Sequence, residues 1–268
     1  MSTTSTSRVE GAIHGAKAAG RSGAFIGYLP VGFPDLQTSI DASVALVENG
    51  VDVLELGLPY SDPVMDGVAI QRATQKSLEA GFRVRDVFTA IREIRQRVDV
   101  PVLVMTYWNP VTQYGVGRFA DDLVAAGGAG LITPDITPDS GAEWLAVSEA
   151  AGLDRVFLAA PTSSDERLRL AARSSRGFVY TVSTMGITGA RTDVDAAART
   201  LVGRLRVAGA DTVCVGIGIS TANQVAEVLG YADGAIVGSA LVTSLADGGV
   251  AAAARTAAAL SEGARAAN

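Results

Sequence analysis

Two residue types that build covalent or metal-binding sites are nearly missing from this chain of 268 residues. It has one cysteine, Cys214, so no intrachain disulfide can form, which is typical of a protein from a reducing cytoplasm. Cys214 stands in the apolar run 212–215 and is expected to be a buried core residue. The single histidine, His14, falls in an expected N-terminal helix, where a solvated or capping role is predicted. A histidine-based catalytic triad and a histidine metal site are therefore not expected.

Excess positive charge and long apolar stretches are also missing. The formal net charge is -6 and the sequence pI is about 4.9, so the chain lacks the basic footprint expected for binding nucleic acids or anionic membranes. No apolar stretch approaches the roughly 18 residues of a membrane span. The first seven residues lack the features of a signal peptide. We expect a disordered tail over 1–7 and one catalytic domain over 8–268, located in the cytoplasm.

Hydrophobic residues make up 48% of the chain and alternate between short apolar runs and longer helical patterns. The runs are rich in Val, Ile and Leu with little polar alternation, as parallel strands covered by helices on both faces must be. About eight such units without a linker predict a single (β/α)8 barrel with an extra N-terminal helix, and an open doubly wound sheet is the alternative. The strands are expected over 24–29, 51–56, 100–106, 130–133, 155–159, 178–182, 212–215 and 234–237. Helices are expected over 36–48, 69–80, 84–98, 142–151, 194–208, 222–229 and around 251–259.

Two carboxylates stand where a barrel of this kind places its chemistry, at the C-terminal ends of strands. Glu55 is a charge one position from the end of an apolar strand, either functional or held in a structural ion pair. The irregular loop that follows carries Asp62 and Asp66 before the next helix. Asp62, before a proline, is expected to be a turn residue, whereas Asp66 is either functional or the N-cap of that helix.

Glycine-rich segments follow the last three strands. They are Met185 to Gly189, Val215 to Ser220 and Val237 to Ser239. In barrels of this kind the last two positions commonly hold a phosphate group on backbone N–H groups and on the N-terminus of a short helix. No Lys or Arg lies within those two segments, so neutral donors would hold the anion.

The stretch Leu54 to Gly67, with the sequence LELGLPYSDPVMDG, closely resembles the signature of the tryptophan synthase α subunit family. Similar agreement is found at Gly23 to Ile26 with Tyr28, at Met105 to Pro110, at Ser183 to Gly189 and in the two terminal glycine segments. The resemblance implies a lyase of tryptophan biosynthesis that cleaves indole-3-glycerol phosphate to indole and glyceraldehyde 3-phosphate by a retro-aldol reaction without a metal.

The resemblance also implies residue roles. Glu55 and Asp66 match the two acid/base carboxylates. Tyr28 and Met105 match residues that line the indole pocket, and Tyr180 matches a tyrosine near the catalytic glutamate. The implied phosphate cradle consists of Gly189, Gly218, Gly238 and Ser239.

The implied partner is a tryptophan synthase β subunit, in a heterotetramer of two α and two β subunits. Pyridoxal phosphate would belong to that partner, and no cofactor is expected in this chain. The loops Pro59 to Gly67 and Thr184 to Thr192 are expected on the catalytic face. Met65, Val68 and Thr184 depart from common family residues, so the coupling to a β subunit is left open. The competing hypotheses are another phosphate-binding barrel enzyme and a weakly catalytic barrel that activates a partner.

Overall fold

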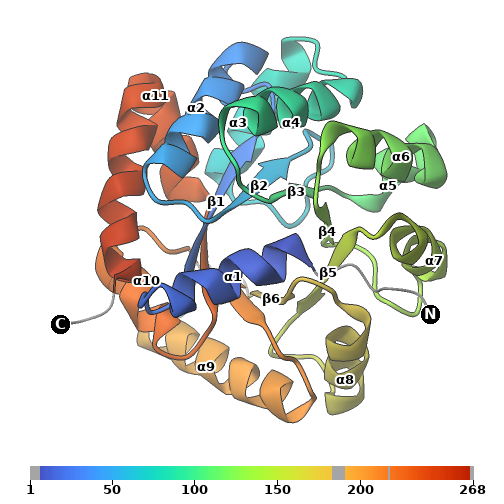
Figure 1. Ribbon diagram of the computed structural model, residues 1–268, viewed down its shortest axis with the longest axis vertical. Helices are drawn as coiled ribbons and strands as arrows, with labels where there is room; N and C mark the ends of the chain where they lie inside the picture. Colours follow the sequence, from blue (N-terminus) through green and yellow to red (C-terminus); the bar gives the residue numbers. More distant parts are fainter. Residues whose placement is uncertain (1–6, 183–190, 217, 266–268) are drawn as a thin grey trace.

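Eight parallel strands close into a barrel in chain order (Figure 1). The computed structural model describes residues 7–182, 191–216 and 218–265, apart from the side chains of 191–195. Within this part of the chain, the expected barrel is confirmed and the open-sheet alternative is wrong. The strands agree with the expected ranges within one or two residues: β1 (Ala24–Pro30), β2 (Val53–Gly57), β3 (Val102–Met105), β4 (Gly130–Thr133), β5 (Asp154–Ala159), β6 (Val179–Val182), β7 (Val213–Gly216) and β8 (Gly234–Val237).

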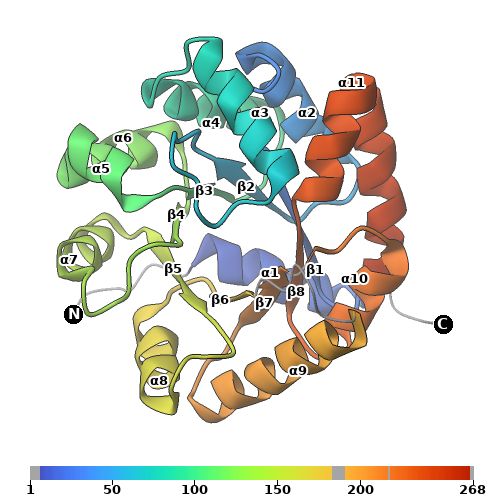
Figure 2. The same cartoon turned by 180° about the vertical axis from the view of Figure 1, so that it is seen from behind.

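Helices surround the barrel on its outside (Figures 1 and 2). Helices α5 and α6 lie outside the expected helical ranges and are separated by a single glycine, Gly115, with a positive φ of 94°. The charged helix α8 also lies outside the expected ranges. The helices are α1 (Arg8–Ala18), α2 (Leu36–Glu48), α3 (Val68–Glu79), α4 (Arg85–Arg97), α5 (Trp108–Tyr114), α6 (Val116–Ala126), α7 (Ala142–Ala151), α8 (Asp165–Ser174), α9 (Arg191–Val207), α10 (Ala222–Leu229) and α11 (Ser239–Ser261).

The last helix, α11, consists of two arms that lie side by side (Figure 2). Gly248 and Gly249 break it with non-helical backbone angles, and Gly249 has a positive φ of 64°. The hydroxyls of Ser244 and Thr256, one on each arm, are 2.7 Å apart. The alanine-rich helix expected around 251–259 is therefore only the second arm. The first arm is a short extra helix that begins directly after β8, a position where barrels of this kind often bind phosphate.

The barrel interior is closed at its N-terminal end by α1 (Figure 1). Val9 and Ile13 of α1 are fully buried and pack with the lower layer of interior side chains. Cys214 belongs to this layer and is fully buried, as expected. Because this end is filled by side chains, a ligand can enter the barrel only from the opposite end. The interior residues of this layer are Ala24, Ile26, Val53, Leu103, Ile132, Val156, Phe178, Cys214 and Ile236.

A buried aspartate, Asp154, holds the start of α1. The Ser7 hydroxyl donates a hydrogen bond of 2.7 Å to its Oδ2, and Nε of Arg176 lies 3.4 Å from its Oδ1. Ser7 also accepts from the N–H of Glu10 as the N-cap of α1. The expected tail over 1–7 is thus wrong at Ser7, because the capping bond and Asp154 fix this residue, while 1–6 lie outside the described residues.

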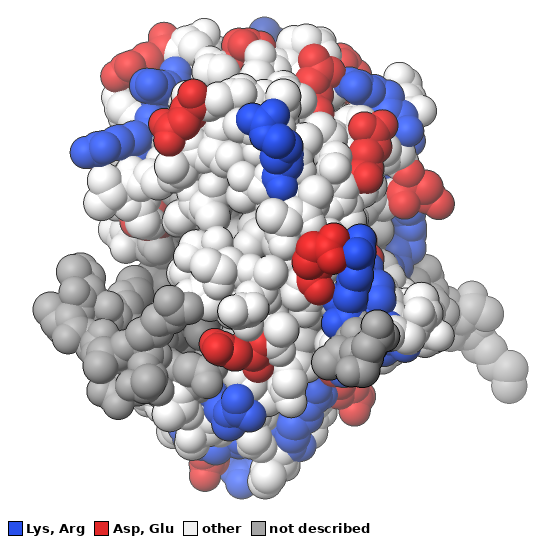
Figure 3. All heavy atoms as spheres, turned by 90° about the vertical axis from the view of Figure 1, so that its left-hand side faces the viewer, with Lys and Arg blue, Asp and Glu red and all other residues white. Residues whose placement is uncertain are grey.

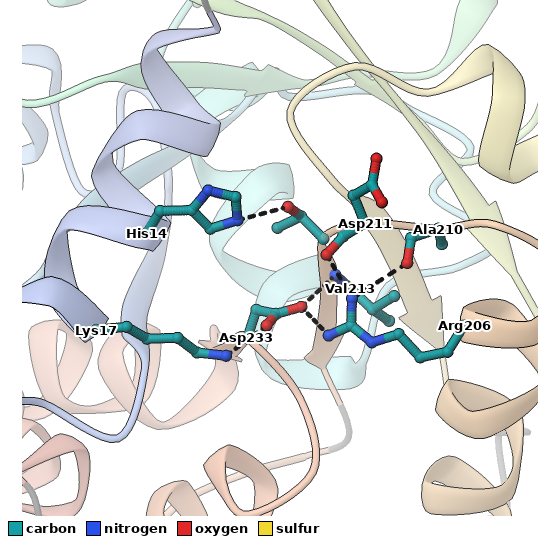
Figure 4. A network of polar contacts seen from close by, with 8 residues as sticks. His14, Lys17, Arg206, Ala210, Asp211, Val213 and Asp233 are labelled. Atoms are coloured by element: carbon teal, nitrogen blue, oxygen red, sulfur yellow. Dashed lines mark hydrogen bonds and ion pairs between the residues drawn. The ribbon is translucent and has the colours of Figure 1, made fainter.

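A second buried aspartate, Asp233, lies before β8 and holds the end of α1 (Figure 4). It pairs with Lys17 at 2.5 Å, pairs with Arg206 of α9, and accepts a 2.8 Å hydrogen bond from the Val213 N–H. Burial alone would raise the pKa of Asp233, but these bonds outweigh burial and lower it. Nearby, the exposed His14 contacts the Thr212 hydroxyl at 3.0 Å and joins α1 to β7, so it is not a capping residue.

Candidate active site

The register of the barrel brings the predicted site residues to one end. Tyr28 on β1 is the lateral partner of Glu55 on β2, and both occupy interior positions near the C-terminal strand ends. Together they line a cavity of about 300 Å³. The cavity contains every predicted site residue except Gly189, which lies outside the described residues. Its lining consists of Tyr28, Glu55, Met65, Asp66, Gly67, Ile70, Met105, Leu158, Tyr180, Val182, Gly216, Gly218, Ile219, Ile236, Gly238 and Ser239.

Glu55 is a buried carboxyl group without an ion-pair partner among the described residues. Its side chain is 1% exposed, and its Oε2 has no hydrogen-bond partner. The alternative of a structural ion pair is therefore wrong for the described part of the chain. Burial, with the nearby Asp66 as the second cause, raises the pKa of Glu55 from 4.5 to about 8. A carboxyl group of this pKa holds a proton at neutral pH and can deliver it.

Asp66 lies on the loop that leads from β2 to α3. The alternative that Asp66 caps this helix is wrong, because Gly67 occupies the N-cap position and no side chain caps the helix. The carboxyl group of Asp66 instead lines the cavity. Burial raises its pKa from 3.8 to about 6, against a hydrogen bond from Tyr107 that lowers it. At neutral pH Asp66 is therefore mostly ionised while Glu55 is mostly protonated.

Asp62 has the local role expected of it. It is exposed and accepts a 2.6 Å hydrogen bond from the neighbouring Ser61 hydroxyl. Its carbonyl accepts from the N–H of Val64. Asp62 does not line the cavity, so it is a turn residue of the loop.

The two tyrosines of the cavity depend on glycines opposite their hydroxyls. A Cβ on Gly57 would overlap the Tyr28 hydroxyl, and a Cβ on Gly216 would lie 2.5 Å from the Tyr180 hydroxyl. Burial raises the pKa of both tyrosines well above the ordinary value, with Glu55 and Asp66 adding to this, so both remain neutral phenols. Because neither phenol ionises near neutral pH, proton exchange in that range falls to the two carboxyl groups.

One wall of the cavity is suited to an anion. Gly238 is the N-cap of α11 and Ser239 its first residue, so the free N–H groups of the first arm begin at the cavity. Gly216 and Gly218 line the same cavity, and Gly218 has a positive φ of 66°. The described lining contains no Lys or Arg. An anion would therefore be held by neutral N–H groups and by the helix dipole.

Comparison with known proteins decides the family. The family model described as tryptophan synthase alpha chain matches residues 15–267. The tryptophan synthase alpha chain of Leifsonia xyli subsp. xyli is 75% identical over 243 residues, which cover 91% of this chain and 93% of that protein. The counterpart from Mycobacterium avium is 56% identical over 227 residues, covering 85% of this chain and 83% of the relative. The chain belongs to the tryptophan synthase alpha chain family.

Solved structures of tryptophan synthase have the same architecture. One from Mycobacterium tuberculosis superposes with a TM-score of 0.92 at 49% identity and covers 98% of this chain and 100% of that chain. A tryptophan synthase complex from Pyrococcus furiosus superposes with a TM-score of 0.81 at 33% identity and covers 89% of this chain and 96% of that chain. The family cleaves indole-3-glycerol phosphate, so this chain is a lyase of tryptophan biosynthesis, and its family implies a β-subunit partner.

Several cavity residues were not predicted as members of the family site. Leu158, Val182 and Ile236 occupy interior positions of β5, β6 and β8. Their signal is hidden because a strand buried on both faces does not alternate between apolar and polar residues. Ile70 of α3 reaches the cavity, and Tyr107 contacts Asp66 from behind. Only the tertiary structure reveals these two contacts.

The charge pattern and the described elements narrow what else the chain could bind. On the face formed by α10 and α11, acidic and basic side chains are interspersed around a broad uncharged area (Figure 3). The described residues of this face therefore show no concentration of basic side chains suited to nucleic acid. Among the described residues, no group of three or more His, Cys, Asp or Glu is arranged to hold a metal ion. None of the described helices combines the length and apolar character needed to cross a membrane.

Proposed function

We propose that Glu55 carries the proton in the cleavage of indole-3-glycerol phosphate and that Asp66 stabilises the charge that develops on the indole ring. One observation carries this proposal: a buried carboxyl group with no ion-pair partner among the described residues and a partly buried carboxylate line one cavity of about 300 Å³. Their environments hold the pKa of Glu55 at about 8 and that of Asp66 at about 6. Two carboxyl groups whose pKa values differ in this way can take the roles of acid and anion at neutral pH.

The chemistry needs both roles. Breaking the bond between indole C3 and the glycerol chain requires a proton on C3, so that the ring can leave, and removal of a proton from the adjacent hydroxyl as its carbonyl forms. Glu55 starts protonated, donates to C3 and then accepts the hydroxyl proton. As C3 is protonated, positive charge develops toward the indole nitrogen, where the anion of Asp66 stabilises it. No metal is required for either step.

The rest of the cavity provides places for the two ends of the substrate. Met105 and Tyr28 would contact the indole ring, with Tyr180 beside Glu55. The phosphate would rest on the N–H groups around Gly218, Gly238 and Ser239, together with the predicted Gly189. Because these donors are neutral, binding of the phosphate would not require a lysine or arginine near the two carboxyl groups.

The test is an assay of indole release by the isolated chain, with Glu55→Gln as the decisive variant. This change keeps the volume of the side chain and removes the proton carrier, so turnover is expected to fall at least ~100-fold. Binding of a phosphate-ester ligand should remain. Glu48→Gln makes the same chemical change at an exposed position on α2 and should retain full turnover. Near-normal turnover of Glu55→Gln would assign Glu55 a structural role.

We further propose that the chain works in the cytoplasm in a heterotetramer of two α and two β subunits, with pyridoxal phosphate in the β subunits. Val64 of the β2–α3 loop and Val68, the first residue of α3, have exposed fractions of 75% and 62%. A hollow of about 880 Å³, lined in part by Val64, lies between this loop, α3 and the first arm of α11, and contains neither Glu55 nor Asp66. An exposed apolar loop beside a hollow suits a protein partner. Of the second predicted loop, Thr184 to Thr192, the part up to residue 190 lies outside the described residues. Arg191 is the first residue of α9.

Titration of a β subunit into the chain tests this assembly. A partner that binds the catalytically competent form of the loop shifts the loop population toward it, so turnover at saturating substrate should rise as the complex forms. Sedimentation of the saturated mixture should give the mass of two α and two β chains. High activity of the isolated chain without detectable association would instead identify a free-standing lyase. If the isolated chain released no indole but activated the β subunit, the hypothesis of a weakly catalytic barrel that mainly activates its partner would be favoured.

A further inference from the structure

The hydroxyl of Tyr107 contacts the loop of Asp66 at two points. It accepts a hydrogen bond of 2.9 Å from the backbone N–H of Met65 and donates one of 3.5 Å to Oδ1 of Asp66. A phenol has one proton to donate and lone pairs to accept with, so both bonds can exist together. Tyr107 itself does not line the cavity, although Met65 and Asp66 do. Among the described residues, Tyr107 is therefore connected to the cavity through Met65 and Asp66 of the loop.

Tyr107 is fixed by the barrel side of the structure. It follows β3 as the N-cap residue of α5 and is 6% exposed. Its carbonyl accepts from the Thr106 hydroxyl at 2.9 Å, and the next N–H, that of Trp108, lies 3.0 Å from both carboxylate oxygens of Asp135. From the β2–α3 loop, the Tyr60 ring also packs against the Tyr107 ring, with 5.3 Å between centroids. The hydroxyl thus has a defined position to which the loop can be held.

We propose that Tyr107 is a positioning residue for the lyase reaction, whose hydroxyl holds the β2–α3 loop so that the Asp66 carboxylate faces the cavity. The inference rests on the proposed role of Asp66. The described backbone N–H bonds of Val64 and Asp66 stay within the loop, to Asp62 and Pro63. The Gln71 amide of α3 donates to the Asp66 carbonyl, but among the described residues only the Tyr107 hydroxyl bonds to the Asp66 carboxylate. Without the Tyr107 hydroxyl, the loop would hold Asp66 in its working position for a smaller fraction of the time.

The bond also sets the charge of Asp66. The described groups that face Asp66 are Glu55 from β2 and the phenols of Tyr28, Tyr107 and Tyr180 from β1, the β3 end and β6. Burial raises the pKa of Asp66, and the Tyr107 hydrogen bond opposes that rise. Removing the hydroxyl therefore raises the pKa of Asp66 further, so a higher pH is needed to ionise it.

The experiment compares Tyr107→Phe with Tyr114→Phe in the full chain. Tyr114 is a matched control because it ends the same helix and its hydroxyl also donates to an aspartate, Asp122, away from the cavity. Indole release from indole-3-glycerol phosphate gives kcat, KM and the pH profile. Hydrogen exchange of residues 61–69 measures the opening of the loop independently of activity.

For Tyr107→Phe we expect kcat to fall about tenfold with little change in KM, because one hydrogen bond to a charged group is lost outside the binding surface. The acid limb of the profile should move up by about one pH unit, and exchange of residues 61–69 should be faster. Tyr114→Phe should change none of these. The inference would be overturned if Tyr107→Phe left both the acid limb of the pH profile and the hydrogen exchange of residues 61–69 unchanged, or if both variants had equal effects. The proposed function would stand in that case, because the wild-type chain would still release indole. A wild-type chain that releases no indole would overturn the proposed function and this inference with it.

Discussion

The hydroxyl of Tyr180 lies 2.5 Å from the point where Gly216 would carry a Cβ. Two carbon atoms of the same ring would each lie 3.1 Å from that point. Gly216 and Tyr180 come from neighbouring strands, β7 and β6, and both line the cavity. The glycine is therefore required by the tyrosine, because any side chain at position 216 forces the Tyr180 ring to move from its place in the cavity.

Gly216→Ala should consequently lower turnover with little loss of folding. A displacement of about 1 Å in an active site can cost up to ~100-fold in rate, so we expect kcat to fall about 10- to 100-fold. Tyr180→Phe added to Gly216→Ala should recover part of the loss, since it removes the atom in closest contact. Gly203→Ala, on the exposed face of α9 with open space around it, is the control and should leave kcat unchanged. Equal kcat in Gly216→Ala and wild type would contradict the steric argument.

The sequence predicts the strands well because each is a short apolar run bounded by glycine or polar residues. Glu55 could be singled out because a charge within such a run is costly. The pairing of Tyr28 with Glu55 could not be predicted from the chain alone, since it depends on the register of the closed barrel. The fold-back of α11 depends on the conformation of Gly248 and Gly249. It could not be predicted, because glycine in a helical pattern does not by itself indicate whether the helix breaks.

Glu55 should make stability depend on pH in one direction. Its pKa rises from 4.5 to about 8 on folding. Below pH ~4.5 both states hold the proton. Between about pH 4.5 and 8 the unfolded state loses the proton while the folded state keeps it, so folding stability falls as pH rises.

Glu55→Gln removes this dependence. We expect the variant to gain stability over wild type as pH rises from 5 to 8, reaching a difference of order a few kcal/mol. Urea unfolding of both proteins at several pH values measures it. Glu48→Gln should give a difference that does not change with pH. A Glu55→Gln difference that stays constant across this range would contradict the raised pKa of Glu55.

Activity should follow a bell-shaped pH profile. The mechanism needs Asp66 ionised and Glu55 protonated at the start, and their pKa values are about 6 and about 8. Accordingly, kcat/KM should rise through pH ~6 and fall through pH ~8, because this ratio reports the free enzyme. The measurement is the initial rate of indole release at low substrate concentration. A profile that stays flat from pH 7 to 10 would exclude a protonated Glu55 as the starting form.

The anion wall predicts a difference between ligands. Gly218 has a φ of 66° and open space around its Cβ position, so Gly218→Leu places a side chain at the cavity wall. The variant should bind phosphate esters at least ~10-fold more weakly, because the N–H groups can approach the anion only where no side chain intervenes, while indole binding changes less. Gly209→Leu is the control, since its φ of 93° imposes similar strain outside the cavity. Equal weakening of both ligands by Gly218→Leu would indicate a general disturbance of the barrel.

The final prediction concerns Asp233, whose carboxylate joins Lys17, Arg206 and the Val213 N–H at the closed end of the barrel (Figure 4). Asp233→Asn leaves two cations facing a neutral amide at a position that is 5% exposed. Since both cations are partly exposed to water, we expect a loss of about 2 to 3 kcal/mol in unfolding free energy rather than the larger loss of a fully buried pair. Denaturant unfolding measures the loss. Asp99→Asn is the control, because Asp99 pairs with Arg8 and Arg95 but its side chain is 90% exposed, and stability should not change. Turnover of folded Asp233→Asn should match wild type, because the cavity opens at the other end of the barrel. A variant as stable as wild type would mean that the Ser7–Asp154 bond and the apolar packing of Val9 and Ile13 hold α1 in place without Asp233.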